Sequence, residues 1–259
     1  MTIDLTNLKA TKETLPPRVL VYGPEKIGKS ALLAEMPDTI FFDIERGTGY
    51  IKAARYPGPL DTYADFTQGL QHLAEQKHNF SSLVVDTGDR LEEIIHKQAA
   101  LEHGKKTVAD VDYGKGYATA ENIWREALSG FDYLREERGI AIFLICHAAI
   151  KRYDNPVVGS YDRYNICLHE NTKGGGSGDL VKHWVDATLF VNYEIFKKSE
   201  DAGFKKKINT AIGGGRNIYC QESPSFVAGN RWGISQPIPY NDEASAWALL
   251  SDAIAKGMQ

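Results

Sequence analysis

The sequence contains few cysteines and no long apolar run, and both absences narrow the class of protein. Its three cysteines, Cys146, Cys167 and Cys220, are widely spaced and form no C-x-x-C pair. We therefore expect a reduced protein with neither a disulfide framework nor a zinc site. No apolar run approaches the roughly 18 residues of a membrane span, so no membrane partner is expected. Residues 1–17 lack the apolar core of a signal peptide, which indicates a cytoplasmic protein.

An excess of positive charge is absent as well. The 259 residues hold 30 lysines and arginines against 34 aspartates and glutamates, a formal net charge of −4. This balance argues against a basic nucleic-acid-binding coat over the whole surface, although a local basic stripe is compatible with it. Hydrophobic residues at 42% and charged residues at 25% are typical of a globular protein with a substantial core.

The most specific feature that is present is the stretch GPEKIGKS, which matches the phosphate-binding pattern G-x-x-x-x-G-K-[ST]. An apolar, β-branched strand is predicted before it at 18–22, and a helix after it at 30–36. This order lets backbone N–H groups surround phosphate oxygens at a helix N-terminus. We predict that this P-loop binds ATP through Gly23, Pro24, Glu25, Lys26, Ile27, Gly28, Lys29, Ser30 and Ala31.

Three of the predicted site residues have distinct roles toward the phosphates and Mg²⁺. Lys29 is expected to reach the β- and γ-phosphates, and the Ser30 hydroxyl is expected to bind Mg²⁺. Asp86 ends the apolar run 83–85 in the manner of a Walker B aspartate. A carboxylate at the carboxyl end of a central strand lies beside the phosphate loop and can hold the hydrated metal.

The residue after Asp86 is Thr87, whereas many ATPases place a water-activating glutamate there. A hydrolase built on this chain needs another carboxylate, and Glu45, just past the second predicted strand, is the best candidate for the base. The alternative for Glu45 is a solvated glutamate paired with Arg46. His147 follows the fourth predicted strand and is expected either to sense the γ-phosphate or merely to cap the strand.

Alternating apolar strands and amphipathic helices predict a single α/β domain over 18–259, after a polar lead-in at 1–17. The central sheet is expected to be mainly parallel and flanked by helices, with antiparallel strands toward the C-terminus. Strands are predicted at 18–22, 39–43, 81–87, 140–146, 187–195, 205–212 and 217–221. Helices are predicted at 30–36, 64–77, 88–103, 118–137 and 242–256, and loops at 104–117 and 148–180.

The predicted loop 148–180 interleaves cations with tyrosines. Cations attract phosphates and tyrosine faces stack on unpaired bases, which is the combination that single-stranded DNA binding needs. The alternative is a solvated loop whose tyrosines pack on the domain. The lysines of loop 104–117 are candidates for a second contact with DNA. The predicted DNA-binding residues are Lys151, Arg152, Tyr153, Tyr161, Arg163, Tyr164 and Lys173.

Together, GPEKIGKS, FFDIERGT, SLVVDTGD and IFLICHAAIKRYD resemble the RecA-like ATPase core over about residues 18–240. More narrowly, they resemble compact RecA-like proteins of bacteriophages, some of which are single-strand annealing proteins. The resemblance implies a RecA-like P-loop fold that uses ATP and Mg²⁺. It also implies a catalytic glutamate after the second strand, which matches Glu45, and a γ-phosphate sensor at the tip of the fourth strand, which is His147 here.

A segment near the C-terminus, Gly229-Asn230-Arg231-Trp232-Gly233, resembles the Lys-Asn-Arg-Phe-Gly motif of RadA-type recombinases and the related segment of DnaB-type helicases. The resemblance implies that Arg231 reaches the neighbouring subunit's nucleotide and stabilises charge on the transferred phosphoryl group. Gly229 replaces the lysine of that motif. Arg216 is the alternative finger, and a surface arginine without function is the remaining interpretation.

We therefore predict an ATP-hydrolysing homo-oligomer, a ring or a filament, with nucleotide at the subunit interface. It would bind single-stranded DNA and promote strand annealing or pairing in phage recombination, alongside a single-strand-binding protein in the bacterial host cytoplasm. Two alternatives stay open. One is a hexameric helicase-like DNA translocase, and the other is a nucleotide-gated regulatory module without DNA binding.

Overall fold

The computed structural model describes residues 15–171, 174–201, 207–241 and 243–258. Within these residues the strands are β1 (Arg18–Gly23), β2 (Thr39–Asp43), β3 (Ala54–Arg55), β4 (Ser82–Asp86), β5 (Ala141–Asn155), β6 (Gly159–Ile166), β7 (Ala187–Asp201), β8 (Lys207–Tyr219), β9 (Gly229–Asn230) and β10 (Ile238–Pro239). The helices are α1 (Lys29–Ala34), α2 (Tyr63–Glu75), α3 (Gly88–Glu102), α4 (Lys115–Arg138), α5 (Ser177–Trp184) and α6 (Ala246–Met258), with 3-10 turns η1 (Val108–Asp110) and η2 (Asp112–Gly114).

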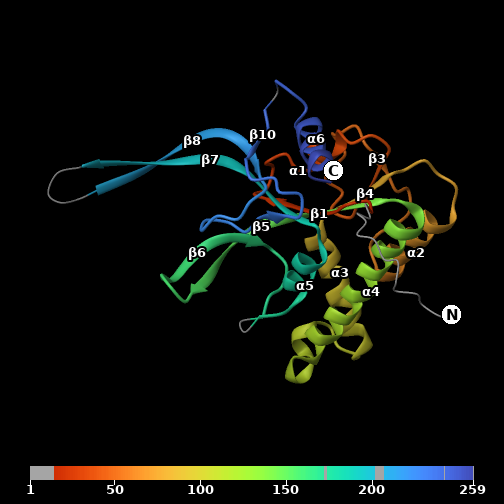
Figure 1. Cartoon of the computed structure of the whole chain (residues 1–259). Helices are drawn as coiled ribbons and strands as arrows, with labels where there is room; N and C mark the ends of the chain where they lie inside the picture. The colour runs from red at the N-terminus through yellow and green to blue at the C-terminus, as the bar shows by residue number, and fades with distance from the viewer. Residues whose placement is uncertain (1–14, 172–173, 202–206, 242, 259) are drawn as a thin grey trace, which may run out of the picture.

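The centre of the molecule is a sheet in the order β10-β8-β7-β1-β5-β4-β2-β3. The pairs from β7 to β3 are all parallel, whereas β8 and β10 join the other edge in antiparallel pairs. Figure 1 shows helices on both sides of this sheet. The predicted fold class, an α/β core with a mainly parallel sheet and antiparallel strands toward the C-terminus, is therefore confirmed.

The central strands are buried on both faces, which explains their continuous apolar sequences. Along β1, Leu20 and Tyr22 face one core cluster, and Val19 and Val21 face the other. The first cluster includes residues of α2, α3 and α4, and the second includes residues of α1 and α6. Successive strand side chains point to opposite faces of the sheet, so a run of apolar residues fills both clusters.

The register of the parallel strands brings several polar residues to one edge of the sheet. Gly23 at the end of β1 lies opposite His147 on β5, and Asp43 at the end of β2 lies opposite Asp86 on β4. In an open α/β sheet, ligands bind at the carboxyl ends of the strands. The fold thus gathers at one edge residues that lie more than a hundred positions apart in the sequence.

Three sequence predictions about the segments between these elements were wrong. Residues 148–180 do not form an extended loop, because β5 continues to Asn155 and pairs with β6 in a hairpin, and α5 follows. The loop predicted at 104–117 ends too late, because α4 begins at Lys115; up to Gly114 the segment is irregular, with η1, η2 and the buried Val108 and Val111. Residues 205 and 206 lie outside the described residues; from Lys207 on, the strands predicted at 205–212 and 217–221 are largely one strand, β8.

Strands β7 and β8 form a long hairpin that extends well away from the rest of the molecule (Figure 1). A register shift between Tyr193 and Ile195 interrupts their pairing. At the base of this hairpin β7 is paired with β1, so the hairpin is continuous with the central sheet. Among the described residues, none of the helices combines the length and the apolar character that crossing a membrane requires.

Candidate nucleotide-binding site

The P-loop connects β1 to α1 and has the backbone conformation that its glycines allow. Gly28 has φ +105°, in a region that favours glycine, and Lys26 has φ 57°. Gly23 is required for a different reason, because a Cβ atom there would lie 2.2 Å from the carbonyl oxygen of Val191 on β7. Ile27 is buried in the core beneath the loop. Packing of Ile27 in the core therefore anchors the loop, and the backbone conformations of Lys26 and Gly28 determine its shape.

Lys29 is buried at the start of α1 and points back into the loop. Its Nζ donates hydrogen bonds to the carbonyl oxygens of Gly23 and Pro24, each at 2.9 Å. Burial lowers the pKa of Lys29, and the nearby Asp86 carboxylate opposes that shift. The amine thus lies at the centre of the loop with two of its three N–H groups bound to backbone oxygens, and the third would be available to a bound phosphate.

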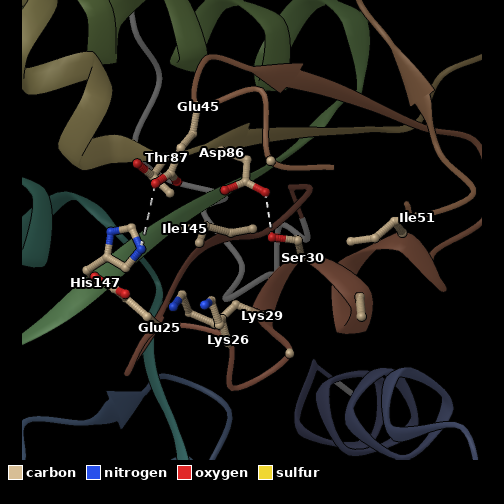
Figure 2. A pocket seen from close by; sticks show the side chains of 13 residues that line it. Glu25, Lys26, Lys29, Ser30, Glu45, Ile51, Asp86, Thr87, Ile145 and His147 are labelled. Atoms are coloured by element: carbon tan, nitrogen blue, oxygen red, sulfur yellow. Dashed lines mark hydrogen bonds and ion pairs between the residues drawn. The ribbon is translucent and has the colours of Figure 1, made fainter. Parts of the chain in front are cut away.

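Ser30 and Asp86 are in direct contact. The Ser30 hydroxyl donates a 2.6 Å hydrogen bond to Oδ2 of Asp86, and Figure 2 shows this bond beside Lys29. A hydroxyl and a carboxylate oxygen are ligands that Mg²⁺ accepts, and both lie next to the phosphate loop. The residues present therefore fit Mg²⁺, with Ser30 and Asp86 as the two that would hold it.

The environment of Asp86 raises its pKa to about 6, mainly because the carboxylate is buried. The nearby carboxylates of Asp43 and Glu45 raise the pKa further, whereas the Ser30 hydrogen bond and the charge of Lys29 lower it. Several acidic groups around one buried carboxylate create negative potential that favours a cation. This electrostatic pattern is a second reason why the position suits Mg²⁺.

Glu45 and His147 approach each other across the same edge of the sheet. His147 Nε2 lies 4.0 Å from Oε1 of Glu45, and its Nδ1 lies 3.4 Å from Oδ2 of Asp89 (Figure 2 shows the Glu45 pair). The backbone N–H of His147 also donates to Oδ2 of Asp89, at 2.9 Å. The hydrogen bond with Asp89 raises the pKa of His147, which favours the protonated imidazole.

Residues of the P-loop, together with Glu45, Asp86 and His147, line one cavity of about 450 Å³. That volume lies in the range of small-molecule sites in proteins. Figure 2 shows side chains from the P-loop, β4 and the tip of the parallel part of β5 around it. Of the predicted site residues, those that line the cavity are Glu25, Lys26, Gly28, Lys29, Ser30, Ala31, Glu45, Asp86 and His147.

The structure brings Arg216, and not Arg231, to the P-loop of its own chain. Arg216 Nη1 donates to the carbonyl oxygen of Ile27 at 2.8 Å. Arg231 lies near the opposite edge of the sheet, where its Nη1 is 3.3 Å from Asp186 and its side chain is 64% exposed. Asp186 in turn accepts hydrogen bonds from Arg18, at the first residue of β1. A role of Arg231 at a neighbouring subunit stays a prediction.

Six of the seven predicted DNA-binding residues lie on the β5–β6 hairpin, over both of its faces. Lys151 is partly buried, and its Nζ contacts the Leu168 carbonyl oxygen and Glu170. The Tyr164 ring packs against Phe190, inside the aromatic part of the core. The side chains of Lys151 and Tyr164 contact other residues of the protein. A contact with DNA would therefore require other residues or a rearrangement.

The remaining members of that set lie farther along the hairpin. The guanidinium of Arg163 stacks over the Tyr153 ring at 3.7 Å and pairs with Glu222, and Tyr153 contacts Tyr161 edge-on. Arg152 is mostly exposed and lies 3.5 Å from Asp154. Lys173 lies outside the described residues. Contact of this set with DNA stays a prediction.

Asp89 is a charged residue beside the site that sequence reasoning missed. It lies in the first turn of α3, for which the Thr87 side chain provides the N-cap. The aspartate follows Asp86 by three positions, and that spacing is ordinary in the first turn of a helix, where acidic residues are favoured. Its contact with His147 depends on how β4 and β5 pair, which no local pattern could reveal.

The parallel sheet, the P-loop and the carboxylates beside it define the class: an α/β P-loop nucleotide-binding protein. Residues 15–232 match the family model described as AAA domain (AAA_24), and the chain belongs to this family. A solved structure, that of the RadB recombinase, is similar with 15% identity and a TM-score of 0.38, over 68% of this chain and 76% of that chain. No curated protein matches the chain. Family membership supports a nucleotide-binding ATPase.

Proposed function

We propose that the chain is a magnesium-dependent ATPase in which Glu45 is the general base. The observation that carries this proposal is the 4.0 Å approach of Glu45 and His147 at the rim of the cavity that also contains Lys29. A carboxylate that can accept a proton from water, beside a phosphate-binding lysine on one cavity, is an arrangement that can support phosphoryl transfer to water, and the imidazole adds a hydrogen-bond donor.

Each side chain has a separate task in this proposal. Lys29 holds the phosphates, and Ser30 and Asp86 hold Mg²⁺, which neutralises negative charge on the phosphates when bound. Glu45 orients the attacking water and accepts its proton. His147, held by Asp89, donates a hydrogen bond toward the terminal phosphate and thereby distinguishes the triphosphate from the diphosphate.

Two substitutions test the assignment. Glu45→Gln should retain ATP binding but lower the turnover rate by about 100-fold or more, because the amide cannot accept the proton. Lys29→Ala should lose ATP binding. Binding is measured with a fluorescent ATP analogue and turnover by phosphate release, each with and without Mg²⁺. A wild-type turnover rate for Glu45→Gln would refute the base, and wild-type hydrolysis by Lys29→Ala would refute the site.

We further propose that hydrolysis is linked to single-stranded DNA held along the β5–β6 hairpin, and that the protein promotes strand annealing or pairing as an oligomer. Strand β5 runs without interruption from the cavity residue His147 into the hairpin. The exposed Arg152 and the Tyr153–Tyr161 pair supply a cation and aromatic rings there. Phage recombination beside a single-strand-binding protein is the biological role that this proposal gives the chain.

A labelled oligonucleotide tests the DNA proposal directly. Binding should be stronger for single-stranded than for double-stranded DNA and should weaken steeply as salt increases, because phosphate contacts release counterions. Arg152→Ala should weaken binding and lower the salt dependence. A closed ring with fast DNA-stimulated turnover would instead support a translocase. Absence of binding at low salt, with ATPase activity intact, would support a regulatory module.

A further inference from the structure

The carbonyl oxygens of the P-loop are held by two separate sets of donors. A loop that turns its N–H groups toward a phosphate must turn carbonyl oxygens away from it, and these oxygens need donors of their own. Lys29 serves the first half of the loop, at Gly23 and Pro24. In the second half, Arg216 donates to the Ile27 carbonyl oxygen and the Tyr240 hydroxyl donates to the Gly28 carbonyl oxygen, both at 2.8 Å, and the Gly28 oxygen also accepts from the Leu32 N–H of α1 at 2.9 Å.

These two sets approach the loop from different sides. Lys29 lines the 450 Å³ cavity together with Asp86 and His147. Arg216 and Tyr240 line a second cavity of about 660 Å³, between α1 and the segment that precedes α6. A phosphate would accept a hydrogen bond from the third N–H of Lys29, whereas the bonds from Arg216 and Tyr240 do not involve that amine. The second set can therefore stay in place when nucleotide is bound.

Arg216 and Tyr240 also fix each other. The Arg216 guanidinium stacks over the Tyr240 ring at 3.5 Å, and its Nε donates to the Tyr240 carbonyl oxygen at 3.1 Å. The Tyr240 backbone N–H donates to the Arg216 carbonyl oxygen at 2.8 Å. The pair fits closely against Gly28, since a Cβ atom there would lie 2.7 Å from both Arg216 Nη1 and the Tyr240 hydroxyl oxygen. A donor group held this rigidly loses little freedom when it binds the loop.

We propose that Arg216 and Tyr240 are positioning residues that clamp the P-loop of their own chain in its nucleotide-binding conformation. This inference rests on the proposed function, because it assigns them to the same ATP site. It differs from a finger role for Arg216, since its guanidinium binds the loop of its own subunit. The clamp stabilises the loop before the nucleotide arrives, so its loss should weaken ATP binding more than it slows the chemical step.

Steady-state kinetics of Arg216→Ala and Tyr240→Phe test the clamp. Arg216→Ala should raise KM for ATP about tenfold, with kcat within about twofold of the wild-type value. Tyr240→Phe keeps the ring under the guanidinium and loses one hydrogen bond, so a smaller rise in KM is expected. Arg216→Lys should fall between Arg216→Ala and the wild type, because one ammonium cannot replace the guanidinium fork. The matched control is Arg125→Ala on the exposed side of α4, which should leave both constants unchanged.

Mixing experiments separate a clamp from a finger. At an ATP concentration below the wild-type KM, a mixture of Arg216→Ala and Lys29→Ala should show no more activity than the sum of the two variants measured alone, because each lacks a group that its own loop needs. An unchanged KM in both Arg216→Ala and Tyr240→Phe would overturn the clamp, and so would a loss of kcat that mixing restores. If Arg216→Ala does not fold, as judged by circular dichroism, Tyr240→Phe alone decides. Absence of ATP hydrolysis in the wild-type protein would instead refute the proposed function.

Discussion

Asp86 carries a proton over a pH range in which an exposed aspartate is ionised. Its pKa of about 6 in the folded protein lies above the ordinary value of 3.8, because burial and neighbouring carboxylates disfavour its charge. The folded state therefore binds more protons than the unfolded state between these values, and stability falls as the pH rises from about 4 to about 6. In the proposed site, the negative charge that binds Mg²⁺ is thus a destabilising feature of the nucleotide-free protein.

Replacing Asp86 with Asn should remove this destabilisation. We expect the stability gain of Asp86→Asn over the wild type to grow by about 2 kcal/mol between pH 4 and pH 7, as measured by urea unfolding without nucleotide. The control is Asp61→Asn, an exposed partner of Arg46, whose effect should not change with pH in this way. A gain for Asp86→Asn that stays constant with pH would contradict the prediction.

The pairing of His147 with Asp89 gives a second prediction for a single side chain. Asp89→Asn should lower the pKa of His147, because the carboxylate that favours the imidazolium is lost. An NMR titration of the imidazole in both proteins measures this change. Asp252→Asn, on the surface of α6, is the matched control. If Asp89→Asn leaves the titration of His147 unchanged, Asp89 does not determine its charge.

The local pattern of the sequence was sufficient to predict the parallel strands β1, β2, β4, β5 and β7, but not the two-residue strand β3 at the edge of the sheet. Strands that are buried on both faces read as apolar runs, and they end in the residues that face the cavity. The hairpin β5–β6 was missed because it leaves the core at His147. Beyond that point the side chains of β5 and β6 lie alternately on the two faces of the hairpin. Residues such as Arg152 and Tyr161 therefore form no apolar run of the kind that marks a buried strand. The way the strands pair brings Asp89 and Arg216 to the site, and local sequence patterns do not specify that pairing.

The junction between β1 and β7 offers a prediction for these two elements. Gly23→Ala should lower the free energy of unfolding by roughly 2–3 kcal/mol, because its methyl group would collide with the Val191 carbonyl oxygen on the neighbouring strand. Thermal or urea unfolding measures this. Gly229→Ala is the matched control, since a methyl group there meets no atom within 4 Å. Equal stabilities of Gly23→Ala and the wild type would show that β1 and β7 can move apart at this point without loss of stability.

For the whole molecule, the position of Arg231 defines how subunits would have to assemble. The P-loop lies at the carboxyl edge of the parallel strands, and Arg231 lies with Asp186 near the amino edge. A role at a neighbour's nucleotide therefore requires head-to-tail contact between opposite edges. Such heterologous contacts generate rings or filaments, which agrees with the proposed oligomer.

Complementation between inactive variants tests this arrangement. Arg231→Ala supplies an intact P-loop and Lys29→Ala supplies an intact arginine, so a mixture should recover part of the ATPase activity if Arg231 acts on the next subunit. Turnover is measured across mixing ratios, with each variant alone as the control. If the variants still assemble, as judged by native mass, but no mixing ratio recovers activity, Arg231 does not act at the neighbouring subunit's nucleotide.

The bonds of Lys29 to the Gly23 and Pro24 carbonyl oxygens leave one of its three N–H groups for a further acceptor. In the proposed site, a terminal phosphate would accept that third N–H while the two backbone oxygens keep the other two. The amine would then stay in one place when the phosphate leaves, so the loop would not have to reorganise between successive nucleotides.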